Sequence, residues 1–293
     1  MRVTQSIMSR NLIQNLNLSR ENMGELQKYA ATGKEITNSS DDPVKFARAS
    51  RYRKTLSQYD QYVRNINNGL GFVDNNAMVM NEFHNLVVEA RSVAIQGADA
   101  SQSASTRLVL ADRINGIIEQ TISIANSSYL GKSIFSGTDT LNMEPFEYDG
   151  NVVTYSGNNG KMSRHISEGL DVEINITGTE LAAAGVFDSL IALREALEAD
   201  DAATVAGYLT DLDSAANNLL GLESKNGLVK SHMLMSDSRI ETARTNILSF
   251  LSETEDSNLA EVIMEYNGEE MAYEAALQVT SKALQLNIMD FIR

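Results

Sequence analysis

The chain has 293 residues, of which 43% are apolar and only two are proline, and it has no cysteine and a formal net charge of −15. The missing cysteines exclude disulfides, thiolate metal sites and cysteine nucleophiles. The negative charge argues against nucleic acid or an anionic membrane surface as a partner. Residues 1–20 lack the apolar stretch of a secretion signal or membrane span, so we expect no membrane insertion and, if the protein leaves the cell, export without a cleaved signal.

The N-terminal residues predict a helix that needs a partner. Residues at alternating steps of four and three from Leu12 to Ala30 are apolar except Ser19, which weakens this coiled-coil pattern, and Gly33 suits a C-terminal cap. A single helix of this size is marginal in water, so we expect it to fray in the free monomer. The expected assembly contacts on this helix are Leu12, Leu16, Met23 and Leu26.

A turn and a long helix are predicted next. Asp42 is the expected N-cap residue, and Pro43 is the expected first residue of the helix. Steps of three and four then continue from Ala49 to Val87 with only His84 plainly polar, which indicates a long helix in a coiled coil or bundle. A loop at 97–105 and a second helix that ends near residue 131 are expected to follow.

The composition changes between about residues 136 and 185, where glycine, asparagine and threonine become frequent. The segment 171–177 alternates polar and apolar residues, which predicts a half-buried strand. Residues 151–155 and 144–148 are two further strand candidates. These short strands predict a small β-rich insert.

Helical periodicity returns after Gly185. The sequence predicts helices over 190–197, 205–219, 229–250 and 259–291. Gly221 to Leu228 is expected to break the register, and the polar segment 252–258 is expected to be a joint. On the last helix, the expected assembly contacts are Leu277, Leu284 and Ile288.

The order of these elements predicts a mainly α fold. Long helices would pack as a coiled coil or bundle, with nested N- and C-terminal halves and a small β-rich inserted domain. Residues 1–42 and 255–293 would form a terminal coiled-coil assembly domain. Residues 43–138 and 185–254 would form a helical rod, and residues 139–184 an outer β-rich insert.

The residues do not combine into a catalytic, cofactor or metal site. The three histidines, His84, His165 and His232, lack further ligands at a metal-binding spacing. Asp41 and Asp42 stand before a proline, where adjacent carboxylates start a helix more often than they form an acid–base pair. We therefore expect a protein that is not an enzyme and binds no cofactor.

Segments at both ends of the chain resemble the flagellin superfamily, which includes flagellins and flagellar hook-associated proteins. The resemblance covers roughly the first 140 and last 65 residues and rests on Leu26 with Gly33–Ile36, Ser40–Pro43, Tyr62–Ile66 with Gly69–Leu70, Ile124–Asn126 with Gly131–Gly137, Tyr273–Val279 and Leu286–Phe291. Met1–Thr4, the Asp-Asp-Pro turn, the short insert and Met289–Ile292 resemble the hook-associated protein 3 branch more than flagellins. Ser257–Glu261 departs from the pattern, because relatives often have an aspartate before the alanine.

This resemblance implies a structural subunit of the extracellular bacterial flagellum, in a ring-like layer that joins hook to filament. It implies type III export and four kinds of partner, namely other copies of itself, hook-associated protein 1, flagellin and a flagellar export chaperone. One alternative is a short flagellin that forms the filament itself. Another, from a different class, is a soluble coiled-coil adaptor or effector protein. An enzyme housed in the β-rich insert is the third alternative, although no nucleophile, base or metal set converges there.

Overall fold

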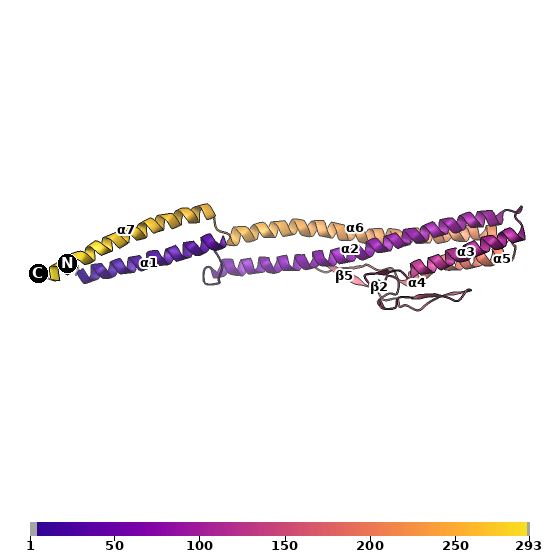
Figure 1. The fold of residues 1–293 in the computed structure, drawn as a ribbon, viewed down its shortest axis with the longest axis horizontal. Coiled ribbons are helices and arrows are strands. Elements are labelled where there is room, and N and C mark those ends of the chain that lie inside the picture. Colours follow the sequence, from indigo (N-terminus) through magenta and orange to yellow (C-terminus); the bar gives the residue numbers. More distant parts are fainter. Residues whose placement is uncertain (1–4, 292–293) are drawn as a thin grey trace. The chain divides into compact units, whose positions relative to one another are not determined.

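The computed structural model describes the backbone of residues 5–291 and the side chains of residue 7 and residues 10–282. The elements of this part of the chain follow in order in Figure 1: α1 (Gln5–Thr32), α2 (Pro43–Ala98), α3 (Ala104–Ala125), β1 (Ser128–Tyr129), β2 (Lys132–Ser133), β3 (Phe146–Tyr148), β4 (Val153–Tyr155), β5 (Ser163–Ser167), β6 (Leu170–Glu173), α4 (Gly178–Ala182), α5 (Val186–Glu198), α6 (Ala202–Glu255) and α7 (Leu259–Phe291). The predicted mainly α fold with a small β-rich insert is confirmed.

Contacts divide the chain into two compact units. We call residues 1–57 and 243–293 the terminal unit, and residues 58–242 the central unit. Each unit combines segments from both halves of the sequence, as expected for a nested chain. The predicted division into three domains stays a prediction.

The ends of the helices in the terminal unit follow from local chemistry. α1 stops at Gly33, whose φ is +68° and whose N–H donates to the carbonyl of Tyr29 at 2.8 Å. A left-handed residue just after a helix is a common C-terminal cap, and glycine adopts it without steric cost. At the start of α2, the Asp42 carboxylate accepts the N–H groups of Val44 at 2.8 Å and Lys45 at 3.0 Å. Asp42 therefore caps α2, and Pro43 is its first residue.

The central unit has its core along one face of α2. Ile66, Val73, Met80 and Val87 are buried, as their heptad spacing suggests, whereas His84 is half-buried. The buried face of α2 is wider than the predicted stripe, because further residues between the heptad positions are also enclosed. These residues are Phe72, Asn76, Val79, Phe83 and Leu86.

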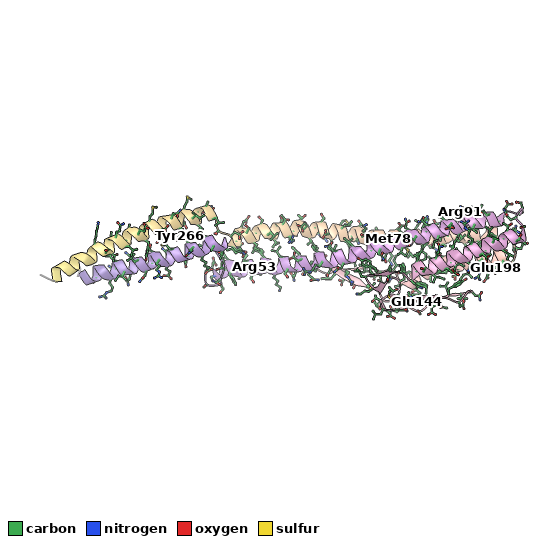
Figure 2. The ribbon with its side chains drawn as sticks, in the orientation of Figure 1. Arg53, Met78, Arg91, Glu144, Glu198 and Tyr266 are labelled. Carbon is green, nitrogen blue, oxygen red and sulfur yellow. The ribbon has the colours of Figure 1, made fainter. Side chains whose placement is uncertain are left out.

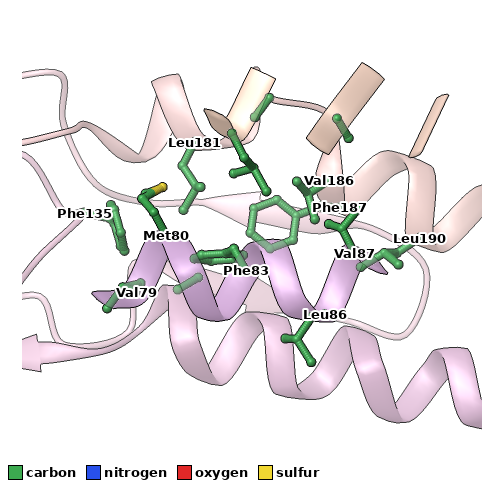
Figure 3. Packing of buried hydrophobic residues seen from close by; sticks show 14 of the residues in the cluster. Val79, Met80, Phe83, Leu86, Val87, Phe135, Leu181, Val186, Phe187 and Leu190 are labelled. Carbon is green, nitrogen blue, oxygen red and sulfur yellow. The ribbon is translucent and has the colours of Figure 1, made fainter. Parts of the chain in front are cut away.

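Aromatic rings from separate elements meet at the centre of this core (Figure 3). The Phe83 ring on α2 is fully buried, 6.4 Å from the ring of Phe135 and 6.3 Å from that of Phe187 on α5, measured between centroids. Both contacts are edge-to-face, a favoured geometry for aromatic pairs. The core thus joins α2 to α5 and to the segment that follows the β1–β2 hairpin.

α6 is a single helix of 54 residues. The predicted break at 221–228 is wrong, because tertiary contacts outweigh the cost of about 1 kcal/mol for each glycine in a helix. Asn226 is buried and its amide donates to the carbonyl of Val73 at 2.7 Å. Met233 is buried about two helical turns further on, where it lies over Gly69 of α2. A Cβ at Gly69 would be 2.6 Å from the Met233 Cε, so glycine lets the methionine side chain lie directly over this helix, and a larger residue would displace the end of that side chain.

α3 ends at Ala125, and the predicted end near residue 131 is wrong. The Asn126 side chain bonds both backbone groups of Phe146, accepting from its N–H at 2.9 Å and donating to its carbonyl at 2.8 Å. This bidentate contact turns the chain out of the helix toward the strands. Tyr129, expected on the helix, lies in the short β1–β2 hairpin instead.

The β-rich part is not one sheet but three separate antiparallel pairs, β1–β2, β3–β4 and β5–β6. The predicted strand at 171–177 is too long, since β6 ends at Glu173. Thr177 instead forms a capping box with Glu180 at the start of α4, and this local bonding competes with strand pairing. β5, which pairs with β6, was not predicted from the sequence.

Glu180 of α4 also bridges two lysines. Its carboxylate is 2.7 Å from the Lys161 Nζ and 2.8 Å from the Lys225 Nζ of α6. Burial raises the pKa of Glu180, but hydrogen bonds from Lys161, Lys225 and the Thr177 backbone outweigh it and hold that pKa at about 2. The cluster therefore ties α4 to α6.

The Glu180 cluster predicts a defined acid sensitivity. A carboxylate with a lowered pKa stabilises the fold fully above its unfolded value, here 4.5, and loses this contribution as pH falls toward the folded value of about 2. Glu180→Gln should therefore lower the Tm of the central unit at neutral pH, and the difference from wild type should vanish between these two values. Thermal scans from pH 7 to pH 2 would measure it, with Glu168→Gln as a control for loss of an exposed charge. A difference that does not change with pH would contradict the assignment.

Candidate assembly surface

In the terminal unit, α1 and α7 pack along each other. The side chains that the contact covers recur at steps of four and three on both helices, which is the spacing of a coiled coil. On α1 they are Leu12, Leu16, Ser19, Met23 and Leu26, and on α7 they are Val262, Tyr266, Glu269, Tyr273, Ala276 and Thr280. We call this contact the α1–α7 seam (Tyr266 is labelled in Figure 2).

A polar contact lies in the middle of the α1–α7 seam. The Ser19 hydroxyl donates to the Glu269 carboxylate at 2.6 Å. Just beyond it, Leu26, Tyr29 and Gly268 line a groove of about 480 Å³ between the two helices. Because a polar pair at a coiled-coil position selects one alignment over others, Ser19 and Glu269 fix the register at some cost in stability.

The structure places the predicted assembly residues in two different settings. Leu12, Leu16, Met23 and Leu26 are half-buried on the seam. Leu277 is 44% exposed and lies off the seam, next to Ala276. The side chains of Leu284 and Ile288 lie outside the described residues. A role for these residues in contacts between subunits stays a prediction.

Sequence reasoning missed several seam residues of α7, namely Val262, Ala276 and Thr280. The cause is that apolar residues surround this helix, so periodicity alone did not single out one face. Large apolar side chains on its other faces remain 44–69% exposed, and they are Ile263, Met264, Met271, Leu277 and Val279. Large exposed apolar side chains in such number are typical of protein association sites. The α1–α7 pair therefore leaves apolar side chains of α7 uncovered.

An ion cluster holds the joint between α1 and α2 against the end of α6. The Glu255 side chain is only 3% exposed, and it pairs with Lys34 at 2.5 Å and with the Arg53 guanidinium. The Glu255 carbonyl also accepts the backbone N–H of Glu35 at 2.8 Å. This cluster was not predicted from the sequence, because its members are far apart in the chain.

The turn before α2 is held by a second carboxylate. Asp41 accepts the backbone N–H of Asn38 at 2.9 Å, the Lys28 ammonium at 2.9 Å and the N–H of Thr37 at 3.0 Å. The hydrogen bonds from Asn38 and Lys28, followed by that from Thr37, hold the pKa of Asp41 well below its usual range. Asp41 therefore stays charged under ordinary conditions and shapes the turn, which is not the environment of a general acid.

Glu255→Gln should loosen the joint without unfolding the helices. Glutamine keeps the shape but loses the charge, and because Lys34 and Arg53 remain about 40% exposed, solvent screening limits the loss to about 1 kcal/mol. We expect the Glu35 amide to exchange with deuterium roughly five times faster. Glu253→Gln, an exposed change on the same helix, should leave that rate unaltered. Equal exchange in both variants would refute a structural role for the Glu255 charge.

The described residues contain no cluster of three or more potential metal ligands. No helix within 5–291 is both long and apolar enough to cross a membrane. His165 is 2.8 Å from Asp171 on the β5–β6 hairpin, and both side chains are largely exposed. An exposed pair of this kind, without a third group or a cleft, does not form a catalytic site.

Comparison with known proteins shows what the chain is similar to. Residues 3–140 match the model of the bacterial flagellin N-terminal helical region. Relatives include a Clostridium tyrobutyricum flagellin (20% identity, 43% of this chain), flagellin FlaB1 of Treponema pallidum (21%, 86% of this chain and 85% of the relative) and flagellar hook-associated protein 3 of Salmonella typhimurium (24%, 62% and 56%). The chain spans about a third of the Clostridium protein's length (33%). The predicted resemblance to the flagellin superfamily is confirmed.

Solved structures narrow the fold further. A Vibrio parahaemolyticus protein assigned to the flagellar hook-associated proteins has a TM-score of 0.68 at 19% identity, over 74% of this chain and all of that chain (100%). Hook-associated protein 3 of Legionella pneumophila has a TM-score of 0.61 at 14% identity, over 70% of this chain and 97% of that chain. The fold is therefore that of hook-associated protein 3 structures, as the ends of the sequence predicted.

Proposed function

We propose that this protein is a structural subunit of the bacterial flagellum and that it joins the hook to the filament. One observation carries the proposal: the α1–α7 pair leaves large apolar side chains of α7 exposed, and burial by neighbouring subunits would stabilise them. The likeness in fold to hook-associated protein 3 supports the position at the junction. The terminal helices would bind neighbours, and the central unit would carry load.

The proposed partners follow from that position. Further copies of this chain would complete a layer, with hook-associated protein 1 on the hook side and flagellin on the filament side. An export chaperone would cover the apolar surface of α7 before assembly, since exposed surface of this kind promotes aggregation. The protein would act outside the cell and would not be an enzyme.

Two other functions compete with this one. The Treponema relative is a flagellin of similar length, which supports a filament subunit. A soluble adaptor protein would use the same helices to bind an unrelated partner. The two rivals predict different behaviour: a filament subunit would grow long filaments from purified protein alone, and an adaptor would have protease-resistant terminal helices as a monomer.

Deletion of the gene tests the proposal directly. Electron microscopy of the deleted strain should show hooks without attached filaments, with flagellin released into the medium. Reintroducing the gene should restore filaments. Filaments that attach normally in the deleted strain would overturn the proposal, and loss of filament protein itself would favour the short flagellin.

A further inference from the structure

The turn of the β1–β2 hairpin exposes a leucine on a strained backbone. Leu130 and Gly131 form the two-residue turn, with φ angles of +52° and +72°. Asparagine usually occupies the first position of such a turn, because a left-handed conformation is unfavourable for bulky residues. Yet the Leu130 side chain is 84% exposed and makes no use of the core. The fold therefore gains nothing from a leucine here.

A second exposed apolar side chain belongs to the loop that lies next to this hairpin. The N–H of Ser133 on β2 donates to the carbonyl of Thr140 at 3.0 Å, which brings the loop 137–144 alongside the hairpin. Leu141 in that loop is 82% exposed, and the cation Lys132 stands on the hairpin itself. We call Leu130, Lys132 and Leu141 the hairpin tip. It presents two aliphatic side chains and one positive charge to the exterior of the central unit.

The same unit contains a groove that complements the hairpin tip. The groove lies between α5 and α6 and has a volume of about 360 Å³. It is lined by small buried side chains such as Ala184, Ser189 and Ala215, and by the half-buried Tyr208. For scale, a cavity of about 150 Å³ is enough to hold benzene. The groove therefore has room for an aliphatic side chain from another molecule.

The charges at the groove have the opposite sign to the hairpin tip. Asp188 of α5 and Asp211 of α6 line the groove and are exposed. Among the residues that the structure describes, neither aspartate forms an ion pair, and neither does Lys132. Because the chain carries a net charge of −15, contact between two copies needs such local opposite charges.

We propose that the hairpin tip of one copy docks into the α5–α6 groove of a second copy. Leu130 enters the groove, and Lys132 faces Asp188 and Asp211. This is a head-to-tail contact, and contacts of that kind build rings or helical arrays rather than closed dimers. The inference deepens the proposed structural function by naming a second subunit contact outside the terminal helices, although the docking itself can be measured without flagella.

Cross-linking of the full chain tests the contact. The wild type has no cysteine, so only the introduced thiols can react with the cross-linker. A copy with Ser128→Cys on the hairpin is mixed with a copy carrying Ser214→Cys at the groove, and a short bis-maleimide is added. We expect cross-linked pairs at least five times more often than with Ser231→Cys, a control at an exposed position of α6 outside the groove. Equal yields would overturn the proposal.

Leu130→Asn separates docking from folding. Asparagine suits the turn, so the Tm should rise by about 2 °C or more while the cross-linking yield falls at least five-fold. Val109→Asn, at another exposed apolar position of the central unit, should leave the yield unchanged. An unchanged yield in Leu130→Asn would overturn the proposal whatever its Tm.

Charge exchange gives the second arm. Lys132→Glu should weaken cross-linking, and combining copies that carry it with copies carrying Asp188→Lys and Asp211→Lys should restore it. If cross-linking is not restored, the charge pairing is refuted.

The docking and the flagellar function can fail separately. If deletion of the gene leaves filaments attached but these cross-linked pairs still form, the contact between copies stands and only the flagellar function fails. If filaments are lost but the pairs do not form, the docking is wrong and the flagellar function stands.

Discussion

Phe83→Ala should destabilise the central unit by about 3–5 kcal/mol, which is the usual cost of removing a fully buried aromatic ring. The Phe83 side chain has no exposed surface, and its ring contacts those of Phe135 and Phe187 from two other segments. The substitution leaves a cavity where α2, α5 and the segment after the hairpin meet. Because a domain of this size is stable by only about 5–15 kcal/mol, we expect Tm to fall by roughly 10 °C.

Met78→Ala is the matched control for this change. Met78 lies on α2 five residues before Phe83 and is 62% exposed, so its removal creates no cavity. Its effect should stay within about 0.5 kcal/mol. Calorimetry, with hydrogen exchange in α3 and α5 to identify the transition of the central unit, measures both variants. A fall in Tm for Phe83→Ala no larger than that for Met78→Ala would show that the core is not centred on this ring.

The sequence predicted helices correctly where apolar residues recur along one face and a strong local signal marks the end of the helix. Asp42 and Pro43 begin α2 and Gly33 ends α1, because caps depend on the chemistry of a few neighbouring residues. The break expected at 221–228 was wrong, because the contact of Asn226 with Val73 is a tertiary contact that the local sequence does not encode. The Glu255 cluster was missed for the same reason.

The last helix shows the limit of periodicity most clearly. Its bounds, Leu259–Phe291, agree with the prediction, since no local signal interrupts it. Its inward face could not be predicted, because apolar residues occur on more than one side. The structure assigns Ala276 to the α1–α7 seam and leaves the adjacent Leu277 at 44% exposure. The face of α7 that carries Leu277 lies outside the α1–α7 seam, so contacts between subunits are best tested there.

Leu277→Asp should abolish assembly of the protein into flagella while α1 and α7 stay paired. If a neighbouring subunit buries this position, an aspartate there loses hydration without gaining a partner, which costs several kcal/mol at each contact. The α1–α7 seam does not include Leu277, so its own packing should survive. We therefore expect a folded subunit that cells carrying only this variant cannot incorporate, with loss of motility and of attached filaments.

Asn267→Asp provides the matched control, since it adds the same negative charge at an exposed polar position of α7. Electron microscopy and swimming assays of complemented strains measure assembly, and hydrogen exchange in α1 and α7 of the purified variants measures pairing. Fast exchange in Leu277→Asp alone would mean that the substitution unfolds the helix pair. Normal filaments in Leu277→Asp would contradict burial of this face between subunits. If filaments are lost while α1 and α7 stay protected from exchange, a contact between subunits lies on the face of α7 that carries Leu277. Asn267→Asp adds the same charge, so charge alone would not explain the loss.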